Sequence, residues 1–338
     1  RSDTGADTPV RNEVTDSGNM TFPPVVSVLL PVYNGAPYLA AAIQSILDQT
    51  HGDWEMIIVN DGSVDASAEI IMQFQDARIR YFDQENRGLA ATLNRAIGLA
   101  RGAYLARQDQ DDLSFPDRLH KQVTFLDAHP DVGMLGSWAE IWNGNRLTGR
   151  LLAHPTDDAS LKFHLLFDNP FVHSSMMIRR CILDEVGGYS EDPSRQPPED
   201  YELWSRVGRR FRVANLPETL VAYREVQGSM SRMGDRPFVR NLITISAENI
   251  ARASGQPATA PEVIALARLH HRVYDGIPRG VRWGRMIKVF QKGARRIAEE
   301  SGVPFSELET LMRRERLRIS YHFFRYRCLR ILGGCEVP

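Results

Sequence analysis

The sequence predicts an α/β protein with a mixed sheet flanked by helices, followed by a smaller, all-helical C-terminal region. Two observations carry this prediction. Between residues 25 and 130, short apolar runs alternate with segments whose apolar side chains recur at helical spacing, a pattern typical of β-α-β units in a parallel sheet. From residue 236 onwards only the helical spacing remains.

The predicted strands of the first half are VVSVLL (25–30), EMIIV (55–59), RIRYF (78–82) and AYLAR (103–107). Apolar residues at helical spacing predict a helix after each strand, over residues 39–47, 70–74, 89–100 and 116–126. Beyond residue 130 the alternation loosens, and strands of a mixed half are predicted at GMLGSW (133–138), SSMMIRR (174–180), FRVANL (211–216) and TLVAYR (219–224). The last predicted helices cover 237–253, 261–274, 281–299 and 305–332.

Charge and composition suggest modules with different partners. Residues 236–338 hold 19 Lys and Arg against 9 Asp and Glu, a net charge of +10, whereas residues 1–235 hold 22 against 33, a net charge of −11. The polar start of the chain predicts a disordered segment. We therefore expect a disordered segment at 1–22, an α/β domain at 23–235 and a basic helical region at 236–338.

The sequence also argues against several classes of protein. Cys181, Cys328 and Cys335 are too few for a disulfide framework and lack metal-site spacing. No apolar run is long enough to span a membrane, and the polar first 22 residues do not resemble a signal peptide. We therefore expect a cytoplasmic protein in a reducing compartment.

Polar clusters directly follow three predicted strands: Tyr33-Asn34, Asn60-Asp61-Gly62-Ser63 and Asp109-Gln110-Asp111-Asp112. Ligands of open α/β sheets bind beyond the carboxyl ends of the strands, so we expect the clusters to meet there. Three carboxylates within four positions repel one another by about 1 kcal/mol per pair. A hard cation shared with substrate phosphates would offset this repulsion, although an Asp-rich stretch can also be a solvated turn.

The series VSVLLPVYNG, IIVNDGSVD, ENRGLAATLNRAIGLARGAYLARQDQDD and PPEDYELW resembles the inverting glycosyltransferases of family 2 in order and spacing, over about residues 25–224. The resemblance implies a GT-A-type, Rossmann-like fold. It also implies transfer of a sugar from a nucleoside diphosphate sugar, with a UDP-sugar favoured, to a hydroxyl group of a glycan or lipid-linked glycan. Bacterial surface polysaccharide synthesis is the setting that it implies.

The resemblance further implies a donor site. Pro31, Val32 and Tyr33 would pack against the base and ribose, and Asp61 would accept a hydrogen bond from the base. Arg87 would either reach the donor or remain surface charge. The full set expected to bind the donor is Pro31, Val32, Tyr33, Asn34, Asp61, Arg87, Gly88, Asp109, Gln110, His173 and Glu199.

Asp109-Gln110-Asp111 matches the family's Asp-x-Asp element. The resemblance implies that Asp111 binds Mg²⁺ or Mn²⁺ directly and that Asp109 binds ribose or completes the metal shell. Such an ion would stabilise the leaving diphosphate as a Lewis acid. Many relatives carry a histidine where this chain has Val226, so the third protein ligand is open, with Glu225 or Gln227 as substitutes.

In PPEDYELW, the resemblance makes Asp200 the general base that takes the proton of the acceptor hydroxyl. Alternatively, Glu199 and Asp200 would only favour a helix N-terminus electrostatically. Trp204 would be a core residue or a platform for an acceptor sugar. His173 would line the donor or acceptor site or be a structural polar residue, and Asp112 would bond backbone amides to fix its loop.

Two other functions use the same residues. A nucleotidyltransferase would direct attack at phosphorus, but it leaves PPEDYELW without a role. A non-catalytic protein that binds sugar nucleotides would also need the donor loops, and the missing histidine is consistent with it.

The C-terminal segment 313–330 contains seven arginines and one glutamate, and Leu317, Tyr321, Phe324 and Ile331 fall at helical intervals. Such a helix would lie on an anionic membrane, as a peripheral contact on the inner face of the cytoplasmic membrane. Alternatively, the stripe would pack on its own domain while the arginines face water or the acidic half. No nucleic-acid-binding module accompanies the charge, so we expect no nucleic-acid partner.

Overall fold

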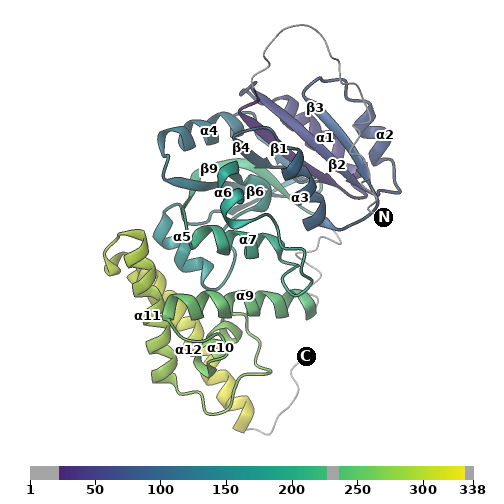
Figure 1. Ribbon diagram of the computed structural model, residues 1–338. Helices are drawn as coiled ribbons and strands as arrows, with labels where there is room; N and C mark the ends of the chain where they lie inside the picture. Colours follow the sequence, from purple (N-terminus) through teal and green to yellow (C-terminus); the bar gives the residue numbers. More distant parts are fainter. Residues whose placement is uncertain (1–22, 227–235, 332–338) are drawn as a thin grey trace, which may run out of the picture. The chain divides into compact units, whose positions relative to one another are not determined.

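The computed structural model describes residues 23–226 and 236–331 (Figure 1). The predicted disordered segment 1–22 lies outside the described residues. Two compact units are present, and the second draws together residues 155–170, 192–214 and the C-terminal helices. The units therefore do not follow the expected boundary between residues 235 and 236, because two earlier segments pack with the C-terminal region.

A mixed sheet organises the first unit. Its strand order is β3-β2-β1-β4-β8-β6-β9-β5, and β7 pairs with β6. β1, β2, β3 and β4 are parallel, whereas β8 runs antiparallel to β4 and β6. The strands are β1 (Val26–Val32), β2 (Trp54–Asp61), β3 (Ile79–Gln84), β4 (Tyr104–Arg107), β5 (Leu113–Ser114), β6 (Val132–Asn143), β7 (Arg146–Leu152), β8 (Met177–Arg179) and β9 (Arg212–Glu225).

Helices flank this sheet, which confirms the predicted mixed α/β architecture (Figure 1). Every residue of β1 and β2 is buried, as expected for parallel strands covered on both faces. The helices of this unit are α1 (Ala36–Leu47), α2 (Ser67–Met72), α3 (Leu89–Leu99), α4 (Arg118–Ala128) and α6 (Arg180–Val186).

One strand prediction was wrong in an informative way. FRVANL and TLVAYR were expected as separate strands, but both belong to β9, which continues through Pro217. Proline has no N–H to donate, which favours a break. However, β5 pairs with β9 only at Val221 and Ala222. At Pro217 that side of β9 needs no donor, and the fixed φ of proline suits an extended chain.

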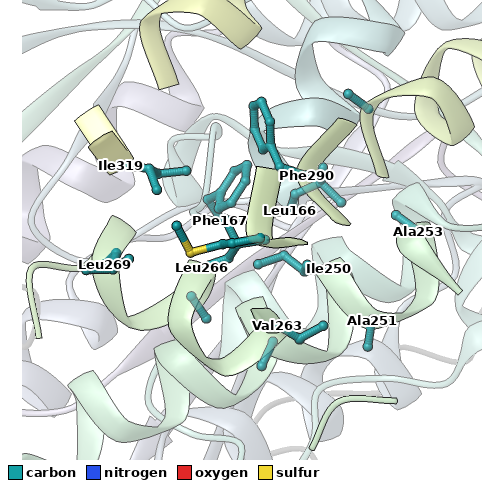
Figure 2. Packing of buried hydrophobic residues seen from close by; sticks show 14 of the residues in the cluster. Leu166, Phe167, Ile250, Ala251, Ala253, Val263, Leu266, Leu269, Phe290 and Ile319 are labelled. Carbon is teal, nitrogen blue, oxygen red and sulfur yellow. The ribbon is translucent and has the colours of Figure 1, made fainter. Parts of the chain in front are cut away.

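The second unit is helical and has its own hydrophobic core (Figure 2). Phe163 and Phe167 lie against Phe290 with ring centroids 6.0 and 6.1 Å apart. Ile250 and Ile319 are buried in the same cluster. The helices of this unit are α5 (Asp158–Leu165), α7 (Glu199–Gly208), α9 (Arg236–Ser254), α10 (Pro261–His270), α11 (Trp283–Ser301) and α12 (Glu309–Ile331).

The C-terminal helices confirm the predicted all-helical region, with shifted ends. α10 ends at His270 rather than 274, and Arg272 just beyond it has a left-handed φ of 60°. Among residues 23–226 and 236–331, none of the helices has both the length and the apolarity needed to cross a bilayer.

Candidate active site

The loops that follow β1, β2 and β4 meet through hydrogen bonds, as the sequence predicts. Gln110 binds the backbone of Tyr33 twice: its Oε1 accepts from Tyr33 N at 2.9 Å, and its Nε2 donates to Tyr33 O at 3.0 Å. Asn34 N donates to Ser63 Oγ at 2.9 Å, and Val64 N donates to Asn34 Oδ1 at 2.9 Å. The three polar clusters therefore form one connected edge of the sheet.

The Tyr33-Asn34-Gly35 turn has the backbone that this connection requires. Asn34 adopts a left-handed φ of 51°, which asparagine tolerates better than most residues. A Cβ atom on Gly35 would lie 2.4 Å from Gln110 Oε1 and 2.7 Å from its Cδ. Glycine at position 35 therefore leaves the space that the Gln110 side chain fills.

Tyr33 is the accessible member of the residues expected to contact the base. Its side chain is 49% exposed, whereas Val32 is 1% exposed and Pro31 is also buried. The Tyr33 ring is therefore the most accessible of the three side chains. The donor contacts of all three residues stay predictions.

Asp61 holds the loop that precedes α3. Its Oδ1 accepts from Arg87 N at 2.8 Å and from Gln84 Nε2 at 2.6 Å, and its Oδ2 accepts from Gly88 N at 2.9 Å. The residue is 3% exposed. Asp61 therefore positions the Arg87-Gly88 backbone, and Oδ2 has capacity for one further hydrogen bond. The Arg87 side chain is exposed.

Asp112 has a structural role in the acidic stretch, as the sequence analysis expected. Its Oδ1 accepts from the backbone N of Arg224 at 2.7 Å, and its other oxygen accepts from Ser174 Oγ. Burial, together with the charges of Asp109 and Asp111, raises the pKa of the Asp112 carboxyl well above its usual value. The side chain thus joins the loop after β4 to β9 and to the short 3-10 turn His173–Ser175 that precedes β8.

Arginines offset much of the negative charge of this stretch. Arg107 forms an ion pair with Asp109. Arg118 is fully buried and donates to Ser114 Oγ at 2.7 Å and to Arg107 O at 2.8 Å. Arg224 Nη1 donates to the backbone O of Asp111 at 2.5 Å. Arginine side chains therefore reduce the repulsion among the three carboxylates. The sequence analysis did not predict these arginines, because they lie on separate elements.

Asp111 differs from its two neighbours. Burial, and next the charge of Asp109, raise the pKa of the Asp111 carboxyl from 3.8 to about 6. In the described part of the chain no side chain donates a hydrogen bond to this carboxylate. Added positive charge would therefore be accommodated best at Asp111.

The residues present fit a metal ion that the substrate helps to bind. Within the described ranges, no group of three or more His, Cys, Asp or Glu side chains is placed to hold an ion. Glu225, one expected substitute ligand, forms an ion pair with Arg150, and Gln227 lies outside the described residues. Asp111 with Asp109 supplies two carboxylates, the number that Mg²⁺ often uses together with substrate phosphates.

His173 lies near this cluster and is neutral at physiological pH. Its Nε2 is 2.9 Å from the hydroxyl oxygen of Tyr189. Burial, followed by the charge of Arg107, lowers the pKa of His173 to about 3. A neutral imidazole adds no positive charge for a diphosphate.

Asp200 and Glu199 belong to the second unit, at the first turn of α7. Asp200 Oδ2 accepts from Asn169 Nδ2 at 2.7 Å, and Oδ1 lies 2.7 Å from Tyr201 N. The N-terminus of a helix favours negative charge at this position. The structure therefore holds the Asp200 carboxylate in a defined orientation, and Glu199 beside it is buried.

The loop before Asp200 is fixed by residues that sequence reasoning did not find. Asn241 Nδ2 on α9 lies 3.1 Å from Pro193 O and 3.2 Å from both Gln196 O and Pro197 O. Trp204 is 2% exposed and belongs to the core, which resolves the choice between core and sugar platform. No spacing rule connects Asn169 or Asn241 to Asp200, so only the fold reveals them.

Comparison with known proteins shows which family this chain resembles. Residues 27–187 match the family model described as Glycosyl transferase family 2. The putative glycosyltransferase EpsE of Bacillus subtilis is 33% identical over 231 residues, which covers 67% of this chain and 82% of that protein. The putative teichuronic acid biosynthesis glycosyltransferase TuaG of the same organism is 30% identical over 213 residues, covering 62% and 82% respectively.

Two solved structures share the fold. Staphylococcus aureus TarS 1–349 in complex with UDP-GlcNAc has a TM-score of 0.60 at 18% identity, with 92% of this chain and 93% of that chain covered. The mannosyltransferase PcManGT from Pyrobaculum calidifontis, in complex with GDP-Man and Mn²⁺, has a TM-score of 0.51 at 18% identity, with 94% and 89% covered. At these identities the likeness concerns the fold alone.

Proposed function

This chain belongs to glycosyltransferase family 2, and on that premise we propose that it moves a sugar from a nucleoside diphosphate sugar to a hydroxyl group of a glycan or lipid-linked glycan, with inversion at the anomeric carbon. The observation that carries the proposal is the edge at which Gln110, Tyr33 and Asn34 connect three loops next to Asp109 and Asp111. The TuaG relative, whose name refers to teichuronic acid biosynthesis, supports polysaccharide synthesis as the setting.

At the donor end, the exposed Tyr33 ring would lie against the nucleoside, and Asp61 would hold the Arg87-Gly88 backbone while Oδ2 accepts one hydrogen bond from the base. A Mg²⁺ or Mn²⁺ ion held by Asp111 and Asp109 would neutralise charge on the diphosphate as a Lewis acid. The nucleotide sugars bound by the two solved structures, UDP-GlcNAc and GDP-Man, support this class of donor. The preference for a UDP-sugar stays a prediction from the family resemblance.

At the acceptor end, Asp200 would take the proton of the attacking hydroxyl group. As that oxygen bonds to the anomeric carbon, the bond from this carbon to the diphosphate breaks, and attack from the opposite face inverts the configuration. Asn169 and Tyr201 N hold Asp200 in a single orientation, which is what a general base needs to contribute roughly 10²–10⁴-fold.

The proposal is tested by measuring donor binding with a matched pair of variants. Asp111→Asn removes the carboxylate with the raised pKa. Asp53→Asn makes the same change at an exposed residue just before β2, at the end of the strand opposite to Asp61 and the candidate site. We expect UDP with Mn²⁺ to raise the melting temperature of the unaltered protein and of Asp53→Asn, and Mn²⁺ to add nothing in Asp111→Asn. If UDP, GDP and dTDP all leave the melting temperature unchanged, the proposed donor site is wrong.

A further inference from the structure

Helix α12 has two apolar faces, and its own unit covers only one of them. Ile319 and Phe323 are 0% and 2% exposed and lie in the core of the second unit. Leu317, Tyr321 and Phe324 are 63%, 62% and 56% exposed. Leu317 and Ile319 are separated by about 200° around the helix axis, so both cannot face the same core. The alternative that this stripe packs on its own domain is therefore wrong for the described residues.

Arginines border the exposed stripe on both sides. The exposed residues Leu317, Tyr321 and Phe324 recur at helical spacing, and Cys328 continues this stripe by one more turn. Exposed arginines lie beside the stripe on the helix surface. We refer to this surface as the arginine-flanked stripe, made of Leu317, Tyr321, Phe324 and Cys328 with Arg313, Arg314, Arg325 and Arg327.

Between Arg313 and Cys328, the exposed residues of α12 include no acid. The acids of α12 are Glu309 in its first turn and Glu315. Glu315 points to the inner side, where its Oε1 is 2.7 Å from His270 Nδ1. From Arg313 to Cys328 the outer surface of α12 therefore presents apolar side chains between rows of cations, and the exposed Glu309 lies one turn before this segment.

A groove adjoins the arginine-flanked stripe. It has a volume of about 580 Å³, and its lining includes Arg282, Arg327 and Arg330 together with Trp283. The Trp283 ring lies 6.2 Å from the ring of Phe324, which places the groove next to the stripe. Guanidinium groups bind phosphate oxygens in a bidentate manner, and tryptophan prefers the boundary between water and lipid.

We propose that α12 docks on an anionic phospholipid bilayer through the arginine-flanked stripe. The helix lies along the membrane surface, its apolar residues enter the region between headgroups and acyl chains, and the arginines of the stripe and groove bind lipid phosphates. A second copy of the chain is disfavoured as the occupant, because stripe against stripe would bring like-charged arginine rows together. The proposal does not rest on the proposed transferase activity.

Vesicle flotation of the full chain tests the proposal. We expect binding to phosphatidylcholine vesicles that contain phosphatidylglycerol, weak binding to phosphatidylcholine alone, and loss of binding at high salt. Each arginine near the surface contributes about fivefold to partitioning, so Arg314→Gln with Arg325→Gln lowers it about 25-fold. Tyr321→Ser with Phe324→Ser lowers it at least about tenfold. All four side chains are exposed, so the melting temperature stays unchanged.

Matched controls locate the effect. Lys288→Gln with Lys292→Gln removes two exposed cations from α11, and Leu147→Ser with Leu151→Ser removes two exposed leucines from β7. Both controls retain vesicle binding within about twofold. The proposal is overturned if either control loses as much binding as the α12 variants or if neutral vesicles bind equally well. It is also overturned if the unaltered chain does not float, or if it is a dimer that the stripe variants convert to monomers.

A probe on the stripe gives a second, independent readout. In a chain with Cys181→Ser and Cys335→Ser, an environment-sensitive fluorophore on Cys328 shifts its emission to the blue when anionic vesicles are added. The same probe on Cys181, which is exposed on α6, with Cys328 and Cys335 replaced, reports no shift. An equal shift at both sites, or none at Cys328, contradicts insertion of the stripe.

Discussion

The contact between Gly35 and Gln110 allows a quantitative test of how the donor edge is connected. Gly35→Ala would place a Cβ atom 2.4 Å from Gln110 Oε1 and 2.7 Å from its Cδ. The Gln110 side chain must then leave the backbone of Tyr33, and two hydrogen bonds of 2.9 and 3.0 Å are lost. At about 0.5–1.5 kcal/mol each, their loss lowers the free energy of unfolding by about 1–3 kcal/mol.

A double-mutant cycle isolates this effect. Gly35 has φ −99° and ψ 3°, a backbone that alanine adopts without strain. In a Gln110→Ala background the contacts of 2.4 and 2.7 Å are gone and only a contact of 3.3 Å with the Cβ atom of residue 110 remains. Gly35→Ala then changes the free energy of unfolding by less than about 1 kcal/mol, because the remaining contact opposes the gain from a less flexible unfolded chain.

Urea unfolding followed by circular dichroism measures the cycle, and UDP binding to the four proteins serves as a second readout. We expect a coupling energy between Gly35 and Gln110 of at least about 1 kcal/mol. Equal effects of Gly35→Ala in both backgrounds would refute the account of how these two loops are joined.

Three further predictions concern separate parts of the molecule. The pKa of Asp111, raised from 3.8 to about 6, means that the folded state binds its proton more tightly, so this contribution to stability falls as pH rises between those values. Urea unfolding at several pH values measures the free energy of unfolding, and in Asp111→Asn its decrease between pH 3.8 and about 6 is smaller. An unchanged pH dependence would argue against burial as the cause of the raised pKa. Phe290→Ala in the helical core lowers the free energy of unfolding by about 3–5 kcal/mol, whereas Phe324→Ala, at an exposed site, changes it by less than about 0.5 kcal/mol; similar losses would contradict the packing in Figure 2. Asn169→Ala removes the donor to Asp200 Oδ2 and lowers kcat by about 10²-fold with donor Kd unchanged; a change confined to Kd would show that Asn169 does not position the base.

The fold was largely predictable because its signals are local. The apolar runs at β1 and β2 and the helical spacing in α3 or α11 follow from neighbouring residues. Errors arose where distant partners decide the outcome. β9 continues through Pro217, where β5 does not pair with it, and the two-residue β5 is too short to leave a pattern.

The candidate site also contains residues that could be predicted from the sequence and residues that only the fold reveals. Asp111 and Gln110 could be predicted from the resemblance of their stretch to a family motif, and the meeting of their loops follows from parallel strands. The charge balance could not be found, because Arg118 and Arg224 reach the acidic stretch from α4 and β9. Likewise, Asn169 orients Asp200 across 31 positions of sequence, a distance at which no periodicity operates.

The most direct test of the central claim is nuclear magnetic resonance of the product formed from a UDP-sugar, Mn²⁺ and a panel of glycan acceptors. We expect one new glycosidic linkage whose anomeric configuration is opposite to that of the donor, with UDP released in equal amount and the rate sharply reduced by Asp200→Asn. Release of pyrophosphate, or a linkage that keeps the donor configuration, would contradict the account.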